Sequence, residues 1–538
     1  MGYTIDIDTG GTFTDGFFAY EGEFRAVKTP TTPHDLTICF LDCVKAGATA
    51  FGVSAETLLN DTDVIRFSNT IGTNCIINRD GSKIGLLISA GFEAMAPTSD
   101  PEGKVPLVEP DMVFGIKERA GSEAPSADEV VSAAQKLVDR GARCLVVAFA
   151  GSETDSANER AARAAIKREY PREYLGSVPV FLASDISSRS GYQERLHTAV
   201  INAYIHGKLG RLLYRAGEDL RRLGFPGQLL IGHNNGAVAR VPKTRPISTY
   251  NSGPAAGLLG AREIGALYGA EVVLSADMGG TSFDVGFVNR GEPNAALRPD
   301  VEGVRCNLPM LAIRAVGAGG GSIASVVNGN LQVGPKSAGA LPGPACFGLG
   351  GTDATVTDAN VVLGLLDPNF FLGGTKALDV DKARHAITRA VAEPLGISVE
   401  DAAWQIVRTI ERHDGQRPRG GAQPGPGKQR YVVGCLRWRR SSPLVQRRRS
   451  SGGEPGYHHS VLGRILRILV IIDGHWSSIS PSRRYQASPS RRDGVGRGSP
   501  CRVANACRKG HARRRRLSRC SALDSRVDHR GGGHQCRD

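Results

Sequence analysis

The sequence predicts an α/β protein made of two related halves, followed by a tail of different composition. Strand-like and helix-like segments alternate through residues 1–411, an acidic, glycine-rich motif occurs twice, and the charge balance changes abruptly after Glu411. A chain of 538 residues is long enough for several compact domains, because domains run at roughly 100–200 residues each. We therefore expect three regions, at 1–190, 191–411 and 412–538.

The first region shows the alternation most clearly. Met1 leads directly into an apparent strand at Tyr3–Ile5. Apolar residues recur at helical spacing over Val130–Arg140 and Ala157–Arg168, and the β-favouring run Cys144–Phe149 lies between them. This order indicates βαβ units around a largely parallel or mixed sheet.

The second region has a similar character. It holds a predicted long helix at Leu196–Leu213, a strand at Val272–Ser275 and a glycine-rich stretch from Gly317 to Gly351.

The composition favours a cytoplasmic enzyme. No charged and apolar leader follows Met1, and no apolar stretch reaches the roughly 20 residues that a membrane span needs. The cysteines of residues 1–411 lack the spacing of a metal site and are expected to be reduced core thiols. They are Cys39, Cys43, Cys75, Cys144, Cys306 and Cys346.

The repeated motif is the decisive feature of the body. Asp8–Asp15 and Asp277–Asp284 both have the pattern Asp-x-Gly-Gly-Thr-x-x-Asp, and a short apolar strand lies on each side of both copies. Two related halves of one fold are implied.

The residue types of this motif suit phosphate binding. Glycine allows backbone N–H groups to approach phosphate oxygens closely, and threonine adds a hydroxyl donor. The preceding Asp8 or Asp277 can hold Mg²⁺, which favours one or two carboxylates together with phosphate oxygens. A single copy would favour a plain glycine hairpin with a capping aspartate. Two matching copies favour a clamp around the phosphates of ATP.

The duplicated motif resembles the phosphate motifs of the superfamily that contains actin, sugar kinases, acetate kinase and the heat-shock chaperone ATPases. More narrowly, residues 1–411 resemble the hydantoinase A/oxoprolinase family. The segments that carry this resemblance are Asp6–Asp15, Gly317–Ala324, Val333–Gly339, Pro342–Gly348 and Thr355–Asn360.

The resemblance implies a duplicated actin-like, sugar-kinase-like ATPase fold with ribonuclease-H-like halves. It also implies ATP and Mg²⁺ as cofactors and a hydantoinase B-type partner subunit. The implied activity is ATP-dependent hydrolysis of a cyclic amide, such as a hydantoin or 5-oxoproline, through phosphorylation of the substrate oxygen. Two alternatives stay open: the ATP-binding subunit of an acetone- or acetophenone-type carboxylase, and a non-catalytic nucleotide-binding protein of the same superfamily.

The candidate site residues belong mainly to the two turns. Asp8 and Asp277 are the candidate catalytic and Mg²⁺-binding acids. The candidate cofactor-binding residues are Gly10, Gly11, Thr12, Thr14, Gly279, Gly280, Thr281, Ser282, Gly319 and Gly320.

Three other segments each allow two interpretations. Thr70–Asn74 could contact substrate or cap a helix, and Ser68–Thr70 stands where family members carry His-Gly-Thr. Asn251–Ala255 could be a helix start or a ligand contact. Asp358, expected at an exposed turn after a threonine-rich strand, could be a distal acid, but a helix cap is favoured.

The tail has a different charge balance from the body. Residues 412–538 hold 29 Lys and Arg against 7 Asp and Glu, whereas 1–411 hold 38 and 46. The net charge of +14 therefore arises in the tail of an otherwise acidic protein. A nucleic-acid-binding arm is one explanation. Evolved basic arms usually mix Lys and Arg, and the tail has 27 Arg and only 2 Lys, so nucleic-acid binding is not expected.

A shifted reading frame explains the tail better. Codons compatible with Gly434–Pro443, read one base later, permit Ala-Phe-Gly-Gly-Ala-Gly-Pro-Leu, which resembles the family's motif for this region. His458–Leu466 and Arg412–Gly415 also permit family-like segments in that frame. In the superfamily this glycine-rich loop holds the adenosine of ATP. We therefore expect an incomplete second half and a disordered tail.

Overall fold

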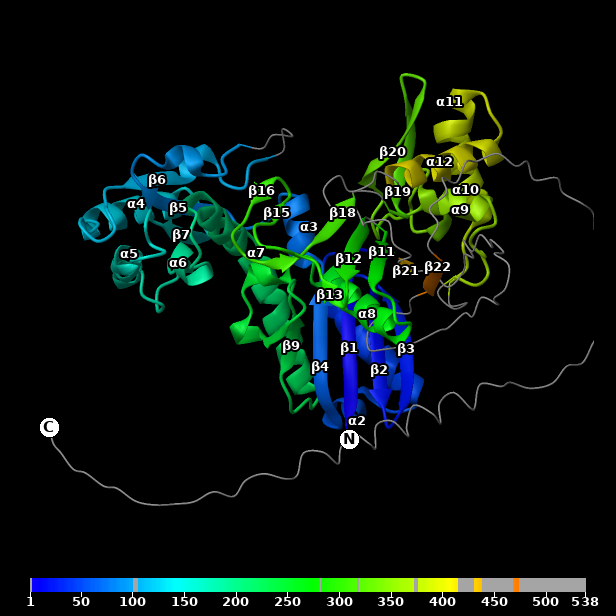
Figure 1. The fold of residues 1–538 in the computed structure, drawn as a ribbon, viewed down its shortest axis with the longest axis horizontal. Coiled ribbons are helices and arrows are strands. Elements are labelled where there is room, and N and C mark those ends of the chain that lie inside the picture. Colours follow the sequence, from blue (N-terminus) through cyan, green and yellow to red (C-terminus); the bar gives the residue numbers. More distant parts are fainter. Residues whose placement is uncertain are drawn as a thin grey trace, which may run out of the picture. The chain divides into compact units, whose positions relative to one another are not determined.

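The computed structural model describes residues 2–99, 105–280, 282–316, 319–371, 376–414, 430–437 and 468–473. All of them belong to one compact unit that extends to His475. Within these residues the protein is α/β, with two six-stranded mixed sheets and one four-stranded parallel sheet (Figure 1).

The first six-stranded sheet carries the first Gly-Gly-Thr turn. Its order is β10 (Val238–Arg240), β9 (Leu229–Gly232), β4 (Thr62–Asn69), β1 (Tyr3–Thr9), β2 (Phe13–Tyr20) and β3 (Glu23–Pro30). β1, β2 and β3 form an antiparallel meander, and β4 and β9 continue the sheet parallel to β1. Figure 1 shows this sheet with β4, β1, β2 and β3 side by side.

Local signals define the helices that follow the meander. The carboxylate of Asp35 accepts a hydrogen bond from the backbone N–H of Thr37 and so caps α1 (Leu36–Phe51), which ends at Gly52 with a φ of 72°. α1 packs on β2 and β3. The shorter helices α2 (Ala55–Asn60) and α3 (Ile71–Ile77) flank β4 in the chain.

The four-stranded parallel sheet follows in the chain. Its order is β6 (Val113–Ile116), β5 (Ile84–Ser89), β7 (Cys144–Ala148) and β8 (Val180–Leu182). Helices α4 (Ala127–Asp139), α5 (Ala157–Glu169) and α6 (Ala183–Ile186) accompany it. The predicted alternation of helix, strand and helix in this region is confirmed, with boundaries within three residues of those expected.

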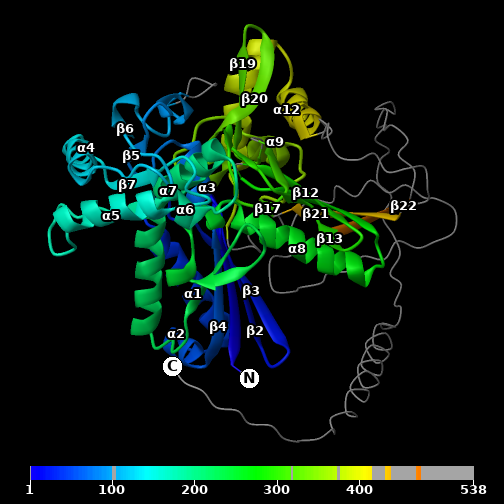
Figure 2. The ribbon, with the colours of Figure 1, turned by 60° about the vertical axis from the view of Figure 1, so that its left-hand side comes forward.

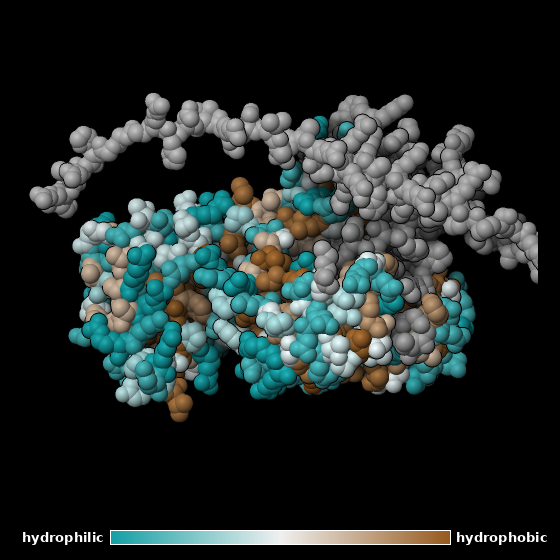
Figure 3. All heavy atoms as spheres, turned by 90° about the horizontal axis from the view of Figure 1, so that it is seen from below, coloured by the Kyte–Doolittle hydropathy of each residue, from teal (hydrophilic) through white to brown (hydrophobic). Residues whose placement is uncertain are grey.

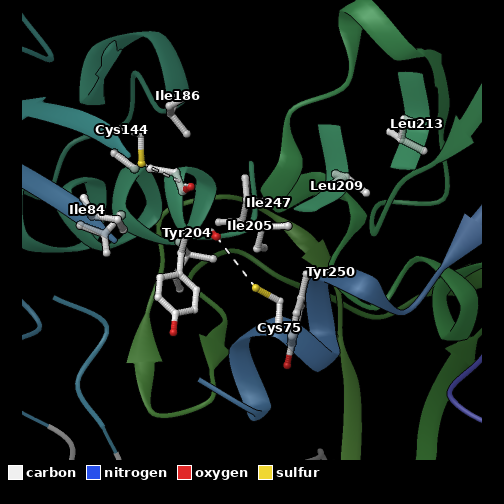
Figure 4. Close-up of a cluster of buried hydrophobic side chains, with 14 of the residues drawn as sticks. Cys75, Ile84, Cys144, Ile186, Tyr204, Ile205, Leu209, Leu213, Ile247 and Tyr250 are labelled. Carbon is white, nitrogen blue, oxygen red and sulfur yellow. Dashed lines mark hydrogen bonds between the residues drawn. The ribbon is translucent and has the colours of Figure 1, made fainter. Parts of the chain in front are cut away.

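The long predicted helix is also confirmed, and it extends beyond the expected ends. α7 (Tyr192–Arg222) packs on α3, on α6 and on β7, so it links the first sheet to the parallel sheet. Figure 4 shows the buried cluster at this junction, where the thiol of Cys75 on α3 lies 3.9 Å from the carbonyl oxygen of Tyr204 on α7.

The second six-stranded sheet carries the second Gly-Gly-Thr turn. Its main order is β13 (Glu292–Pro293), β12 (Phe283–Asn289), β11 (Val272–Met278), β21 (Arg430–Arg437) and β22 (Ile468–Asp473), and β18 (Ile313–Val316) also pairs with β12. β11 is antiparallel to β12 and parallel to β21, as β1 is to β2 and β4. α8 (Ser252–Leu267) precedes β11 and packs on it (Figure 2).

The remaining elements form a smaller cluster after the second sheet, together with short strand pairs. β19 (Ser322–Val327) and β20 (Asn330–Ser337) make a hairpin, and α9 (Val356–Val362), α10 (Val380–Ile387), α11 (Glu393–Leu395) and α12 (Val399–Asp414) pack beside it. Two-residue strands pair as β14 (Ala295–Ala296) with β17 (Met310–Leu311), and β15 (Asp300–Val301) with β16 (Val304–Arg305). Single helical turns lie at Glu93–Met95, Pro110–Met112, Val241–Lys243, Pro246–Thr249, Ala345–Phe347 and Thr388–Ala392.

Burial agrees with the expectation for the cysteines. All six thiols of the body are buried and none of them forms a disulfide within the described residues. Burial raises the pKa of the Cys75, Cys144 and Cys306 thiols to about 12. The face shown in Figure 3 is mostly hydrophilic, with hydrophobic residues in scattered patches. In the part of the chain that the structure describes, no helix is long and apolar enough to cross a membrane.

The described elements run past the expected boundary at residue 411. α12 continues to Asp414, and β21 and β22 come from the tail and pair into the second sheet. The tail therefore contributes two strands to the second sheet, where an incomplete second half and a disordered tail were expected. The remaining tail residues, including the expected adenosine-loop counterpart beyond Arg437, lie outside the described residues.

Asp358 corrects a second expectation. It is fully buried in the first turn of α9, with no threonine-rich strand before it. Its carboxylate accepts hydrogen bonds from the N–H groups of Ala345, Cys346 and Thr355 and from the Thr355 hydroxyl. The favoured role as a helix cap is confirmed, in the form of a capping box with Thr355.

Candidate active site

The first Gly-Gly-Thr turn joins β1 to β2. The backbone N–H of Gly10 donates to the carbonyl oxygen of Phe13 over 2.9 Å, which closes a tight turn. The Thr31 hydroxyl donates to the Gly10 carbonyl oxygen over 2.9 Å, so β3 also supports the turn. Hydrogen bonds to Phe13 and Thr31 therefore stabilise the conformation of the turn.

Thr14 lies inside the hairpin. Its side chain is fully buried, and its hydroxyl lies 3.3 Å from that of Thr9 and 3.2 Å from that of Thr31. Thr12, two residues earlier in the chain, contacts the second turn. The structure thus gives Thr14 a supporting position within the hairpin.

The second turn closes in the same way. The N–H of Gly279 donates to the carbonyl oxygen of Ser282 over 2.8 Å. Behind it, the N–H of Gly320 donates to the Gly279 carbonyl oxygen over 3.0 Å, and the N–H of Gly319 donates to the Ser322 hydroxyl over 2.8 Å. Gly320 therefore supports the second turn with its N–H group, whereas Gly319 bonds within its own loop. Thr281 lies outside the described residues.

The two turns meet directly. A Cβ atom placed on Gly280 would overlap the hydroxyl oxygen of Thr12, so a larger residue at this position would force the Thr12 side chain to shift. The structure therefore brings the two copies of the motif, 269 residues apart in the chain, into one place. The sequence pattern predicted that the two turns face each other, and in the structure Thr12 contacts Gly280.

Each turn has two carboxylates on one face of its sheet. Asp8 lies directly opposite Asp15 across the first hairpin, and Asp277 lies opposite Asp284 across the second. Residues directly opposite each other in an antiparallel pair project to the same face. Both turns therefore present an acid at the end of the first strand, beside the glycines.

The outer acids of the two hairpins differ. Asp15 forms a 3.1 Å ion pair with Lys28, its register partner on β3. Asp284 has Ala315 as its register partner on β18, and burial raises the pKa of its carboxyl to about 7, an effect that the Ser282 hydroxyl at 3.2 Å opposes. The two copies are therefore similar in backbone and different in electrostatics.

The N-terminus of α8 approaches the first acid. A Cβ atom on Gly253 would lie 2.9 Å from Oδ1 of Asp8, so glycine permits this close approach. Asn251 precedes the helix with a φ of 54°, and its N–H donates to the Thr73 hydroxyl over 3.2 Å. The interpretation of this segment as a helix start is confirmed, and the positive end of the helix lies beside a carboxylate.

The segment that departs from the family pattern lies beside the same turn. Ser68 and Asn69 pair in register with Asp8 and Thr9, and Thr70 donates from its N–H to the Thr9 carbonyl oxygen over 3.0 Å. The Ser68 hydroxyl and the Asn69 amide nitrogen are buried without a hydrogen-bond partner among the described residues. Buried donors of this kind usually meet a partner, so their position beside the turn suits a site that binds an oxyanion.

The arrangement fits a nucleotide with Mg²⁺. Gly280 and Gly253 allow the two turns, and α8 and Asp8, to approach each other closely. Among the described residues, the buried donors of Ser68 and Asn69 at the end of β4 have no hydrogen-bond partner. The same residues contain no cluster of three or more His, Cys, Asp or Glu side chains that could hold a metal ion. Mg²⁺ needs no such cluster, because it takes one or two carboxylates together with phosphate oxygens and water. Asp8 and Asp277 lie near the end of the first strand of each hairpin, beside the glycines.

A cavity of about 360 Å³ adjoins the first turn. Gly10 and Gly11 form part of its wall, and the loop 31–37, α3 and one face of α7 form the rest. The sequence contained no local signal for this cavity, because its walls come from segments up to about 200 residues apart.

The chain belongs to the hydantoinase/oxoprolinase family. The model of the hydantoinase/oxoprolinase N-terminal region matches residues 4–170, and the hydantoinase/oxoprolinase model matches residues 195–413. The resemblance expected from the motifs is therefore confirmed.

Among curated relatives, the chain is similar to the acetophenone carboxylase gamma subunit of Aromatoleum aromaticum. The two are 40% identical over 436 residues, which cover 76% of this chain and 60% of that protein. It is also similar to the caprolactamase subunit alpha of Pseudomonas jessenii, at 32% identity over 431 residues, covering 76% of this chain and 61% of that protein. The chain thus spans about three fifths of the length of these relatives.

Acetone carboxylase, which carries out ATP-dependent acetone carboxylation, has a similar fold in its solved nucleotide-free structure. The TM-score is 0.69 at 28% identity, over 76% of this chain and 62% of that chain.

Proposed function

We propose that this protein binds ATP between its two Gly-Gly-Thr turns and uses it to activate the oxygen of a small carbonyl substrate. The contact between Thr12 and Gly280 carries this proposal, because it joins the two motifs into one clamp. On this view the body is a duplicated actin-like core, which is supported by the matching order of β1, β2 and β4 and of β11, β12 and β21. Bound ATP would supply the phosphoryl group that makes an amide or enolate oxygen reactive.

The residues of the clamp then have distinct roles. Gly10, Gly11, Gly279 and Gly280 would approach the phosphates with their backbone, and the Thr12 hydroxyl would add a donor. Asp8 and Asp277 would hold Mg²⁺, directly or through water. Thr281 and Ser282 belong to the same turn. Thr14 and Gly320 would support the turns from behind, and Gly319 would shape the loop that carries Gly320.

The proposed reaction is ATP-dependent opening of a cyclic amide. The similarity to the ATP-dependent caprolactamase of Pseudomonas jessenii supports this substrate class. A second candidate is the ATP-binding subunit of a ketone carboxylase, which the 40% identity to an acetophenone carboxylase subunit favours. Both relatives are subunits, so we propose that a partner subunit completes the active site.

Substitution of the two acids tests the proposal. Asp8→Asn and Asp277→Asn should each lower substrate-dependent ADP release at least about 100-fold, because each removes a carboxylate proposed to hold the Mg²⁺ that would stabilise the transferring phosphoryl group. The assay uses the frame-restored protein with its partner subunit, and compares 5-oxoproline, hydantoin and caprolactam with acetophenone plus bicarbonate.

The control variant is Asp42→Asn, which changes an exposed acid of α1 that forms a 3.8 Å ion pair with the exposed Lys45. It should retain full turnover. Normal turnover in both Asp8→Asn and Asp277→Asn would remove the clamp from the reaction.

A further inference from the structure

The cavity beside the first turn has an uneven charge distribution. Three cationic side chains of α7 line it, from Lys208, Arg211 and Arg215. Positions spaced by three and four residues lie on one face of a helix, so these side chains form a single row along the cavity wall.

Two members of this row are neutralised. Lys208 forms a 2.6 Å ion pair with Asp80, and Arg215 forms a 3.0 Å ion pair with Asp35. Both acids also line the cavity. The Thr37 hydroxyl and backbone N–H, together with Arg215, lower the pKa of Asp35, so this acid is fully ionised near neutral pH.

Arg211 is the member without such a partner. It stands between the two neutralised cations, and it has no ion pair or hydrogen bond to the other residues that the structure describes. The two flanking acids are already engaged by their own cations. A small anion in the cavity would therefore meet one uncompensated guanidinium group.

Other residues that line the cavity are neutral and polar. Gly10 and Gly11 of the phosphate turn line the cavity together with Thr70 and Asn74, and the Asn74 amide donates to the Thr70 hydroxyl over 3.2 Å. Hydroxyl and amide groups can bind a carbonyl or amide without adding charge. The cavity thus combines cationic and neutral polar groups in one wall, and that wall includes the turn proposed to hold ATP.

The floor of the cavity is fixed by packing. Cys75 of α3 and Leu212 of α7 are both buried and line it, and α3 is held on α7 by the contact between the Cys75 thiol and the Tyr204 carbonyl oxygen (Figure 4). The volume of about 360 Å³ lies near the lower end for small-molecule sites, roughly 300–1,000 Å³. It suits a molecule smaller than a nucleotide.

We propose that this cavity is the substrate site and that Arg211 binds a carboxylate group of a small substrate. A planar guanidinium matches a carboxylate with two parallel hydrogen bonds. The substrate would then place its carbonyl or amide end at Thr70 and Asn74, beside Gly10 and Gly11. This inference rests on the proposed function and adds a substrate class to it: small carbonyl compounds that carry a carboxylate.

Matched ligand pairs test the charge requirement without ATP. Calorimetric titration of the full chain compares 5-oxoproline with 2-pyrrolidinone, and glutarate with glutaramide, since the members of each pair differ in their carboxylates. We expect at least one carboxylate to bind about tenfold more tightly than its neutral partner, and Arg211→Gln to remove that difference. Arg211→Lys should keep part of it.

The matched control is Arg222→Gln on the last turn of the same helix, where Arg222 is exposed and pairs with Glu218 and Asp219. It should keep the full preference. The inference is overturned if no carboxylate is preferred over its neutral partner, or if the preference survives Arg211→Gln.

The terminal phosphate of ATP offers the same oxyanion chemistry, so ADP and ATP are titrated into the same variants. Unchanged nucleotide affinity in Arg211→Gln supports the substrate assignment, and a roughly tenfold loss of ATP affinity alone would move Arg211 to the nucleotide site. Failure of the proposed function appears differently, as an absence of ATP turnover in the unmutated protein while the carboxylate preference persists.

Discussion

At the residue scale, the two glycine turns depend on one pair of facing residues. Thr12 and Gly280 come from different halves of the sequence. A Cβ atom on Gly280 would overlap the Thr12 hydroxyl oxygen. Gly279 is the adjacent glycine, where a Cβ atom would meet only the Ser282 carbonyl oxygen at 3.4 Å. An alanine is therefore expected to fit better at Gly279 than at Gly280.

Gly280→Ala should separate the turns. We expect it to lower the free energy of unfolding by about 1–3 kcal/mol through overpacking, and to weaken ATP binding at least about tenfold because the clamp widens. Urea unfolding and calorimetric ATP titration measure the two effects. Gly279→Ala is the control and should change both quantities less. Equal effects of the two substitutions would contradict the assigned geometry.

The sequence identified the acids and glycines of the turns, and it was less informative about their neighbours. Thr14 and Asp358 looked like candidate site residues in the pattern, yet both are fully buried and bonded within the protein. A motif shows which residues recur, whereas burial and hydrogen bonding depend on strands far away in the chain. No sequence motif pointed to Arg211, because its proposed role depends on α7 lying next to the loop 31–37.

At the element scale, a buried ionic network joins β7, α5, α6 and α7. Arg195 in the first turn of α7 is fully buried, donates to the Ser152 hydroxyl over 2.7 Å and to the Phe149 carbonyl oxygen over 3.2 Å, and pairs with Glu153 at 2.8 Å. Glu159 of α5 accepts from the same Ser152 hydroxyl over 2.6 Å. The network fixes the start of α7, the helix whose later turns line the cavity.

Arg195→Met should therefore destabilise the protein by about 3 kcal/mol, since it leaves buried acceptors without their donor. Urea unfolding gives this value directly. Arg222→Met, on the exposed last turn of the same helix, should change the free energy of unfolding by less than about 0.5 kcal/mol. A similar small change in Arg195→Met would show that the network contributes little to the position of α7.

At the scale of the whole molecule, the family match and the composition change at nearly the same residue. The hydantoinase/oxoprolinase model matches to residue 413, and the excess of arginine begins at Arg412. This coincidence supports the hypothesis that the coding sequence leaves its frame there. β21 lies beyond this point and pairs with β11, and β22 pairs with β21.

Restoring the frame by one base near the codons for Glu411–Gly415 should raise ATP affinity at least about tenfold, because the expected adenosine-binding loop returns. Titration of ATP into the two proteins measures the difference. Mass spectrometry of tail peptides from the natural source is the complementary measurement. Peptides that match residues 412–538 as written, with equal ATP affinity in the two proteins, would contradict the hypothesis.

The sequence by itself determined the α/β class, the family and the two turns, because alternation, repetition and glycine content are local properties of the chain. It also indicated the main helices and strands of residues 130–213. Only the tertiary structure decided that Thr12 contacts Gly280 and that Arg211 lines a cavity. It also decided that the register partner of Asp15 is the cation Lys28, whereas that of Asp284 is the neutral Ala315. These facts depend on strand register and on the packing of distant segments, which no single stretch of sequence encodes.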